Sequence, residues 1–312
     1  MFPRVDPSVP TPALIPMGLT ARTQLVAAAL PADIVMILLS SFVIGLVFGS
    51  FLNVVVYRLK SGEPIGLSRS FCPYCKTTLK WHDLVPLLSF ICLRGRCRYC
   101  HKKISWQYPI VEILSGLIWV IVAYKINFQF FPTFQSGSSI SQPNLGNLGE
   151  IGTIFIFLYY IFILSSLLVI AVYDFKWRII PDKIIYPAIV VVLIFNLFEI
   201  SKYQNIMIFL WPFLVALIAF LFFFMFFYFS KGRAMGLGDA KLSFLIGLFL
   251  SPLLAIAAFM LAFVIGAIFG IILIGLGKKS LKSQIAFGPF LVLGAAIAFF
   301  FSDFIIKLLN LN

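Results

Sequence analysis

The segment "IMIFLWPFLVALIAFLFFFMFFYF" (Ile206–Phe229) contains no charged residue in 24 positions. A helix needs about 20 apolar residues to cross the hydrocarbon core of a bilayer. The rest of the chain is similar, since 62% of its 312 residues are hydrophobic and only 11% are charged. No soluble globular domain has such a composition. The sequence therefore predicts an all-α, polytopic membrane protein.

Eight apolar segments are expected to span the membrane, at residues 34–56, 107–124, 151–172, 183–199, 206–229, 240–250, 253–277 and 285–308. The sixth is short, because its 11 residues of helix rise only about 16 Å. We count it as a span because of the distribution of Lys and Arg described next. No A-x-A-like cleavage site follows the first span, so we interpret it as retained rather than as a signal peptide. Residues 1–32 are rich in Pro, Thr and Ala and are expected to be a weakly ordered lead-in.

The net charge of +13 is distributed unevenly along the chain. With eight spans, 19 of the 24 Lys and Arg residues fall on one side of the membrane, in residues 57–106, 173–184, 230–241 and 278–284. Positive charge accumulates in cytoplasmic loops, so these segments are expected in the cytosol. The basic charge orients the protein and attracts anionic lipid, and it does not require nucleic acid as a partner.

The chain is expected to consist of two functional units. Residues 132–150 are rich in Ser, Gly, Asn and Gln and are interpreted as an external linker. They separate an N-terminal unit, residues 33–131, from a six-span unit, residues 151–312. The N-terminal unit contains the large cytosolic loop 57–106. No internal repeat of fixed period is evident.

The cytosolic loop carries two C-x-x-C pairs with 21 residues between them, formed by Cys72, Cys75, Cys97 and Cys100. Each C-x-x-C turn directs two thiolates at one point, and four thiolates form a closed tetrahedral zinc site. Such a metal would fold a loop that is too polar to build its own core. Two disulfides would require an oxidising compartment, and an iron–sulfur cluster is rarer at this spacing. Structural zinc is therefore the predicted ligand.

Three other residues of the loop could in principle take part. Cys92 lies in an apolar context and is interpreted as a small hydrophobic residue. His82 and His101 could replace a cysteine ligand, but four cysteines already complete the set.

Two aspartates lie at the expected cytosolic boundary. Asp174, in "YDFKWRIIPD", follows a long apolar segment, and Asp239, in "MGLGDAKL", precedes a short one. Taken singly, each could be an ordinary interfacial charge. Gly236 and Gly238 remove side-chain bulk beside Asp239 and permit a close backbone approach. If the two carboxyls meet, they share a proton, so that one activates water while the other polarises a peptide carbonyl.

Other hydrolytic constellations are missing from the sequence. It contains neither H-E-x-x-H nor G-x-S-x-G. Both histidines lie in the cysteine loop, which excludes a Ser–His–Asp triad in the spans. The pattern therefore favours an aspartic protease at a membrane surface.

The chain resembles the prepilin (type IV leader) peptidases from about Gly45 to Ala295. The resemblance is carried by the two C-x-x-C pairs together with "GSFLNVVVYRL" (Gly49–Leu59), "LRGRCRYC" (93–100), "ISWQYPIVEILSG" (104–116), "IIPD" (179–182), "GLGDAKL" (Gly236–Leu242) and "FGPFLVLGA" (287–295). It departs from the family in its unmatched lead-in and at Ala286, where the family commonly has Pro.

The resemblance implies a function. The family cleaves the short basic leader of type IV prepilin and type II secretion pseudopilin precursors, at the cytosolic face of the bacterial inner membrane. Many members then methylate the new N-terminal residue with S-adenosylmethionine. The residues that the resemblance assigns to cleavage are catalytic Asp174 and Asp239, with supporting Gly236, Gly238, Asp182 and Lys241. The cysteine loop then belongs to the methyltransferase part, for which Glu112 is a candidate residue, and the sequence does not locate the methyl-donor site.

Two alternatives remain from other classes. A presenilin-like intramembrane protease also uses Y-D and G-x-G-D, but the Pro-Ala-Leu-Pro motif of that family is missing from this chain, and that family lacks the cysteine loop. A transporter subunit with a zinc-clamped loop would need acids near the middle of the membrane. Glu112, inside the second expected span, keeps that alternative open.

Overall fold

The computed structural model describes residues 32–64, 69–130, 149–203, 206–232, 235–277 and 285–308. The expected lead-in lies outside these residues except at Ala32, and the expected linker except at Gly149 and Glu150. The chain divides into two compact units, Met1–Ile37 and Leu38–Asn312, and the contacts below lie within the second.

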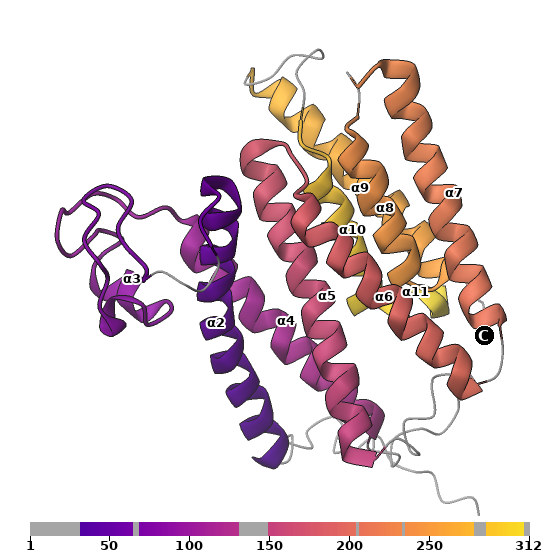
Figure 1. The fold of residues 1–312 in the computed structure, drawn as a ribbon, viewed down its shortest axis with the longest axis horizontal. Helices are drawn as coiled ribbons and strands as arrows, with labels where there is room; N and C mark the ends of the chain where they lie inside the picture. Colours follow the sequence, from indigo (N-terminus) through magenta and orange to yellow (C-terminus); the bar gives the residue numbers. More distant parts are fainter. Residues whose placement is uncertain are drawn as a thin grey trace, which may run out of the picture. The chain divides into compact units, whose positions relative to one another are not determined.

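The described residues are helical and contain no β-strand, which confirms the predicted all-α class (Figure 1). Two isolated β-bridges occur, both in the cysteine loop. The α-helices are α2 (Ala32–Ser61), α3 (Leu88–Cys92), α4 (Gln107–Phe130), α5 (Gly149–Trp177), α6 (Asp182–Tyr203), α7 (Met207–Ser230), α8 (Leu237–Phe249), α9 (Pro252–Gly275), α10 (Gly288–Phe300) and α11 (Ser302–Leu308), with a 3-10 turn, η1, at Trp81–Asp83.

Five helices among the described residues are long and apolar enough to cross a membrane, namely α2, α4, α5, α7 and α9. A sixth is added if α10 and α11 count as one span, although they are bent by 79° at their junction. The eight expected spans are therefore not confirmed. The 13 residues of α8 rise about 20 Å, well short of the hydrocarbon core.

Several expected boundaries are displaced because helices continue past the apolar segments, and two of them concern the cysteine loop and Asp174. α2 ends at Ser61 rather than at residue 56, so it includes Arg58 and Lys60 of the expected loop. α5 ends at Trp177 rather than at residue 172, so Asp174 lies inside the helix and not after it. A helix satisfies its backbone polar groups internally, so it need not end where the apolar side chains end.

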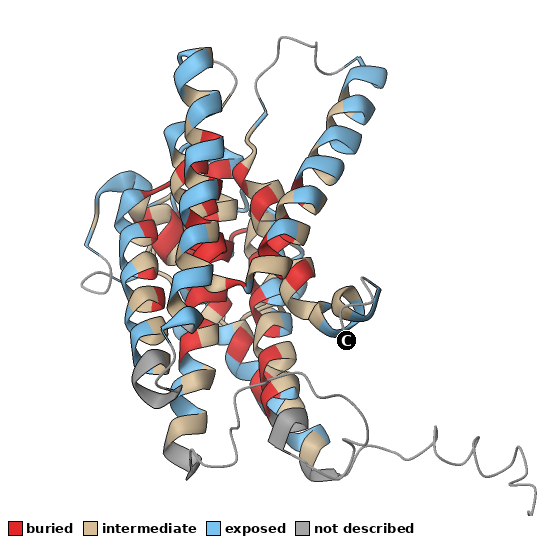
Figure 2. Cartoon of the chain, turned by 90° about the vertical axis from the view of Figure 1, so that its right-hand side faces the viewer, coloured by how far each residue is buried: buried red, intermediate tan, exposed pale blue. Residues whose placement is uncertain are grey.

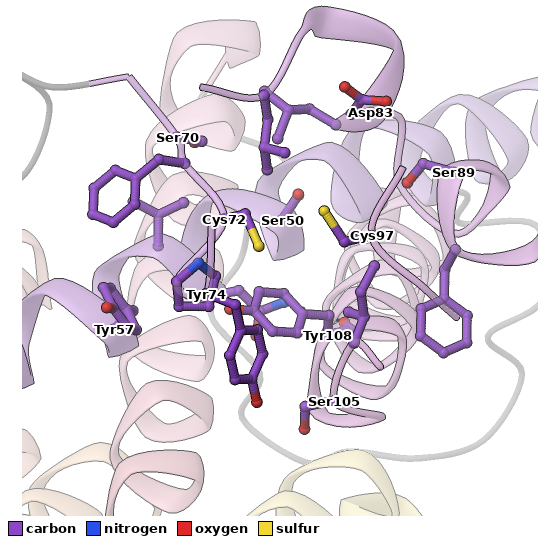
Figure 3. A pocket seen from close by; sticks show the side chains of 18 of the residues that line it. Ser50, Tyr57, Ser70, Cys72, Tyr74, Asp83, Ser89, Cys97, Ser105 and Tyr108 are labelled. Carbon is purple, nitrogen blue, oxygen red and sulfur yellow. Dashed lines mark hydrogen bonds between the residues drawn. The ribbon is translucent and has the colours of Figure 1, made fainter. Parts of the chain in front are cut away.

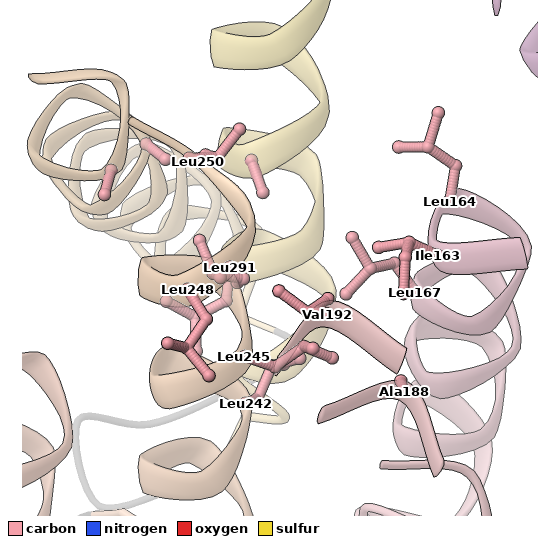
Figure 4. Close-up of a cluster of buried hydrophobic side chains, with 14 of the residues drawn as sticks. Ile163, Leu164, Leu167, Ala188, Val192, Leu242, Leu245, Leu248, Leu250 and Leu291 are labelled. Carbon is pink, nitrogen blue, oxygen red and sulfur yellow. The ribbon is translucent and has the colours of Figure 1, made fainter. Parts of the chain in front are cut away.

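The main hydrophobic core lies between α5, α6, α8 and α10 (Figure 4). Leu242 and Leu245 of α8 are fully buried there with Ile163 of α5, Val192 of α6 and Leu291 of α10. Figure 2 shows that buried residues occupy the facing sides of the helices while the outward sides are exposed. Exposed apolar side chains on the outward sides are suited to contact with lipid.

Small residues let the helices around α8 and α10 approach closely. A Cβ added at Gly247 of α8 would lie 2.6 Å from the Cα of Ala216 in α7. A Cβ at Gly294 of α10 would collide with the carbonyl oxygen of Ala258 in α9. Such contacts are typical of helix packing in membranes, where backbones approach at small side chains.

α5 packs against the helices that precede it, α2 and α4, and against the helices that follow it. Besides its part in the main core, it forms a second cluster in which Leu168 and Tyr173 contact Val56 of α2 and Val111 of α4. The C-terminal part of α5 therefore lies beside α2 and α4, the two helices that flank the cysteine loop, as well as beside the core formed with the later helices.

Candidate active site and metal centre

Asp174 and Asp239 are brought together by two helix ends. Asp174 lies in the last turn of α5, and Asp239 is the third residue of α8. Their exposed fractions are only 5% and 8%, and the negative charge of Asp174 acts on Asp239. The two carboxylates therefore share one buried site although 65 positions separate them in the sequence.

A backbone amide holds each carboxylate. The N–H of Gly288, the first residue of α10, donates to Oδ2 of Asp174 at 3.1 Å. The N–H of Gly236, the N-cap of α8, donates to Oδ2 of Asp239 at 3.1 Å. A helix C-terminus disfavours a negative charge and a helix N-terminus favours one. The N-terminus of α10 therefore compensates for the placement of Asp174 at the end of α5.

Gly288 is the residue of this site that the sequence analysis missed. A Cβ at this position would lie 2.6 Å from Oδ2 of Asp174, so any other residue would displace the carboxylate. The segment "FGPFLVLGA" was noted only for its resemblance, because 114 residues separate Gly288 from Asp174. The predicted close approach at Gly238 is observed, since a Cβ there would lie 2.9 Å from the Cβ of Ile180.

The protonation of Asp239 is shifted by its surroundings. Burial has the largest effect and the charge of Asp174 adds to it, against the hydrogen bond from Gly236, and the pKa of Asp239 is raised to about 7. Asp239 belongs to α8, which is not one of the five candidate spans. Its carboxyl can therefore hold a proton near neutral pH, as a pair that shares a proton requires.

Asp182 and Lys241 form an ion pair beside this site. Lys241 Nζ lies 2.7 Å from Oδ1 of Asp182 and 4.9 Å from the ring centroid of Tyr186. The Asp182 side chain is 57% exposed. Asp182 thus links the start of α6 to α8, which fits a supporting position rather than that of a third buried carboxylate.

The four predicted cysteines form one cluster. The Sγ atoms of Cys72, Cys75, Cys97 and Cys100 all lie within 4.8 Å of one another, and those of Cys72 and Cys100 are 3.9 Å apart. Four sulfurs at about 2.3 Å from a tetrahedral zinc ion would be about 3.8 Å from each other. All five cysteines are free thiols. The donor set and its spacing therefore fit one zinc ion.

Two turns of the same geometry present these thiols, and the second repeats the first 25 residues later. In each turn the first cysteine donates its N–H to a carbonyl and accepts an N–H through its own carbonyl at 2.9–3.0 Å, in the pairs Cys72–Thr77, Lys76–Cys72, Cys97–Lys102 and His101–Cys97. Lys76 and His101 both have a positive φ, 57° and 55°. This repeat is not evident in the sequence, because the two turns share their backbone geometry but only the pattern C-x-Y-C in sequence.

The remaining cysteine and the two histidines of the loop lie outside the metal cluster. Cys92, which was interpreted as a small hydrophobic residue, is exposed. It is the last residue of the five-residue helix α3, in which no residue is buried. Neither histidine joins the metal cluster of the described residues. Hydrogen bonds from the side chain and backbone of Thr77 lower the pKa of Cys75 to about 6, which favours the metal-binding thiolate.

A cavity of about 450 Å³ lies between the cysteine loop, α2 and α4 (Figure 3). Glu112 of α4 lines it and is only 6% exposed. Oε2 of Glu112 accepts a hydrogen bond from the N–H of Leu87 at 2.9 Å. The candidate residue Glu112 therefore lies at the wall of a cavity and not next to the aspartate pair.

A series of hydrogen bonds joins three helices beside this cavity. Lys176 Nζ donates to Oε1 of Gln107 at 3.3 Å, and Nε2 of Gln107 donates to Oδ1 of Asn53 at 3.4 Å. Nδ2 of Asn53 donates to the carbonyl of Tyr108 at 3.2 Å. Asn53 and Gln107 were not predicted as site residues from the sequence. Their signal was the presence of amide side chains at the ends of apolar helices.

Comparison with known families accounts for both parts of the chain. Residues 43–126 match the bacterial peptidase A24 N-terminal domain, and residues 161–271 match the type IV leader peptidase family. The first match contains the cysteine cluster and Glu112, whereas the second contains both aspartates.

Individual relatives match over most of the chain. A prepilin leader peptidase/N-methyltransferase of Stutzerimonas stutzeri is 27% identical, over 85% of this chain and 91% of the relative. One of the same name from Bacillus subtilis is 26% identical, over 85% and 95%. Another from Klebsiella pneumoniae is 34% identical, over 50% and 60%. No solved structure matches the chain.

Proposed function

Because this chain belongs to the type IV leader peptidase family, we propose that it removes the leader of prepilin precursors and then methylates the new N-terminal residue. The two relatives that match over most of their length carry both activities in their name. The single observation that carries the peptidase function is the buried pair of Asp174 and Asp239.

The two carboxyls have different parts in peptide hydrolysis. Asp239, whose pKa is raised, holds the proton and polarises the scissile carbonyl. Asp174, which accepts the N–H of Gly288, is the base that takes a proton from the attacking water. Gly236 and Gly288 hold the two carboxylates in place, and the ion pair of Asp182 and Lys241 fixes the start of α6 against α8.

The protein acts as a multi-pass protein of the bacterial inner membrane, with its active site at the cytosolic face. Support for this side comes from the sequence, since Lys and Arg concentrate in the segments that contain the cysteine loop and both aspartates. The same basic segments attract anionic lipid. The substrates are type IV prepilins or the related pseudopilins, whose leader is basic in this family.

The cysteine cluster holds a structural zinc ion. Cys72, Cys75, Cys97 and Cys100 are the ligands, and a closed set of four thiolates leaves no position for substrate. The metal organises the loop 57–106, which has few buried apolar residues. The loop and residues 33–131 around it form the methyltransferase unit, and residues 151–312 form the peptidase unit.

The two alternatives considered from the sequence are less well supported. A transporter would place its acids in mid-membrane, whereas Asp174 and Asp239 lie at helix ends. Glu112 lies at the start of α4 beside the cysteine loop, not halfway along the helix. A presenilin-like protease would not account for the match of residues 43–126.

Incubation of the purified full-length protein with a precursor pilin and S-adenosylmethionine tests the proposal. Intact-mass measurement should show a pilin without its leader and then a further product that is heavier by one methyl group. Omission of S-adenosylmethionine should stop the reaction at the first product. An uncleaved precursor would contradict the peptidase function, and a cleaved but unmethylated product would contradict the second activity.

A further inference from the structure

The cavity beside the cysteine loop has the size of a small-molecule site. Its volume of about 450 Å³ falls within the range of about 300–1,000 Å³ for such sites. Figure 3 shows side chains from separate segments around it, Ser50 and Tyr57 from α2, Tyr74 from the loop and Tyr108 from α4. Because neither aspartate of the candidate active site lines it, the cavity is a second site.

Its wall contains polar groups that are costly in a membrane helix. Glu112 and Asn53 are buried to 6% and 2% exposure in helices that are candidate spans. An acid inside such a helix is expensive and marks a functional site. The loop reaches Glu112 through the amide of Leu87, which adopts a left-handed φ of 57° that leucine rarely takes. The loop is therefore shaped around this carboxylate.

The aromatic part of the wall suits a nucleoside. Tyr57, Tyr74 and Tyr108 line the cavity together. Nucleobases stack favourably on aromatic side chains, whatever the identity of the base. Arg98 and Tyr99 bind the carboxylate of Asp83, at 2.6 and 3.2 Å, and this network braces the wall near η1.

The charged part of the wall suits a zwitterion that carries an extra positive charge. Glu63 and Glu112 supply carboxylates, and basic groups are also present at Arg58, Arg98, Lys102, Lys103 and Lys176. In a partly buried site, a carboxylate stabilises a cation that is bound next to it. A base, an amino-acid carboxylate and a sulfonium would each find an opposite or stacking partner here.

We propose that this cavity binds S-adenosylmethionine, with the adenine among the tyrosines and the sulfonium near Glu112. The inference rests on the proposed methylation and assigns its donor site. In the transfer, the lone pair of the pilin amine forms a bond to the methyl carbon, and the bond from sulfur to that carbon breaks with its electron pair staying on sulfur. The amine proton leaves to water, and the product is S-adenosylhomocysteine.

Donor binding can be measured without relying on activity. Radiolabelled S-adenosylmethionine is titrated by equilibrium dialysis against the full chain in nanodiscs, and cleavage of a precursor pilin reports folding. The variants Glu112→Gln and Tyr108→Leu should each weaken binding about tenfold, which corresponds to the loss of one good contact. The matched controls Glu199→Gln and Tyr124→Leu lie outside the cavity wall and should stay within about twofold of wild type.

A third variant guards against misfolding. Tyr74 is 60% exposed in the loop, so Tyr74→Leu cannot disrupt a helix core and should weaken binding by a similar factor. Suppose that the wild-type protein methylates the pilin and that Glu112→Gln and Tyr108→Leu still cleave the precursor. If these variants then bind S-adenosylmethionine with wild-type affinity, the assignment of the donor site to this cavity is overturned, and the proposed methylation is not. If Glu112→Gln and Tyr108→Leu lose cleavage as well, the test rests on Tyr74→Leu. Wild-type affinity for S-adenosylmethionine in that variant would then overturn the cavity assignment. A wild-type protein that neither binds the donor nor methylates would overturn the proposed methylation itself, and this inference with it.

Discussion

The N–H of Gly288 donates a hydrogen bond to Oδ2 of Asp174 at 3.1 Å, across 114 residues of sequence. It joins the N-terminus of α10 to the last turn of α5 at a carboxylate that is only 5% exposed. The N-terminal end of one helix thus stabilises a charge that the C-terminal end of another disfavours. The ionised form of Asp174 depends on a residue that has no side chain.

Replacement of Gly288 by alanine should reduce leader cleavage by about 10²-fold, because its Cβ would displace the Asp174 carboxylate. The measurement is kcat/KM on a precursor pilin. Gly275→Ala is the matched control, since a Cβ there meets no atom within 4 Å. Equal activity of the two variants would show that the contact with Gly288 does not position the carboxylate.

Asp174→Asn and Asp239→Asn should each reduce cleavage by about 10²–10⁴-fold, because a pair that shares a proton needs two carboxyls. Both variants should still insert in the membrane and keep the zinc. Asp182→Asn provides the comparison, since exposed ion pairs contribute at most about 1 kcal/mol and its partner Lys241 remains. Full activity in either of the first two variants would refute the catalytic pair.

The rate of cleavage should fall as the pH rises above neutrality. The pKa of Asp239 is raised to about 7 by burial and by the charge of Asp174, so its proton is present below that pH and is lost above it. At acid pH the rate should fall again as the base of the pair becomes protonated. A pH profile of kcat/KM tests this, and a rate that stays constant from pH 6 to about pH 9 would contradict a protonated Asp239.

Elemental analysis of the purified protein should find one zinc ion per chain. Cys97→Ser should lose the metal, whereas Cys92→Ser should retain it because Cys92 lies outside the cluster and is exposed. Loss of zinc should reduce methylation more than cleavage, because Cys72 and Cys97 line the cavity and not the aspartate site. Equal loss of both activities in an inserted Cys97→Ser protein would make the loop part of the peptidase site.

The sequence predicted those features that depend on local spacing. The turns at Cys72 and Cys97 each place two thiols within a few residues, so that the C-x-x-C spacing alone indicates the cluster. It missed Gly288, whose role arises only when α10 packs against α5. The eight expected spans are not confirmed among the described residues, because α8 is too short to cross the bilayer by itself and because the 79° bend between α10 and α11 arises from tertiary packing that hydropathy does not report.

Asp174 and Lys176 lie two residues apart in the last turn of α5, yet Asp174 meets Asp239 while Lys176 lines the cavity. Residues two apart on a helix point about 200° away from each other, and a helix is about 10 Å across. An extended peptide covers that distance in about three residues. The last turn of α5 therefore has the proposed cleavage site on one side and the proposed methyl-donor cavity on the other, so that a single helix turn serves both reactions.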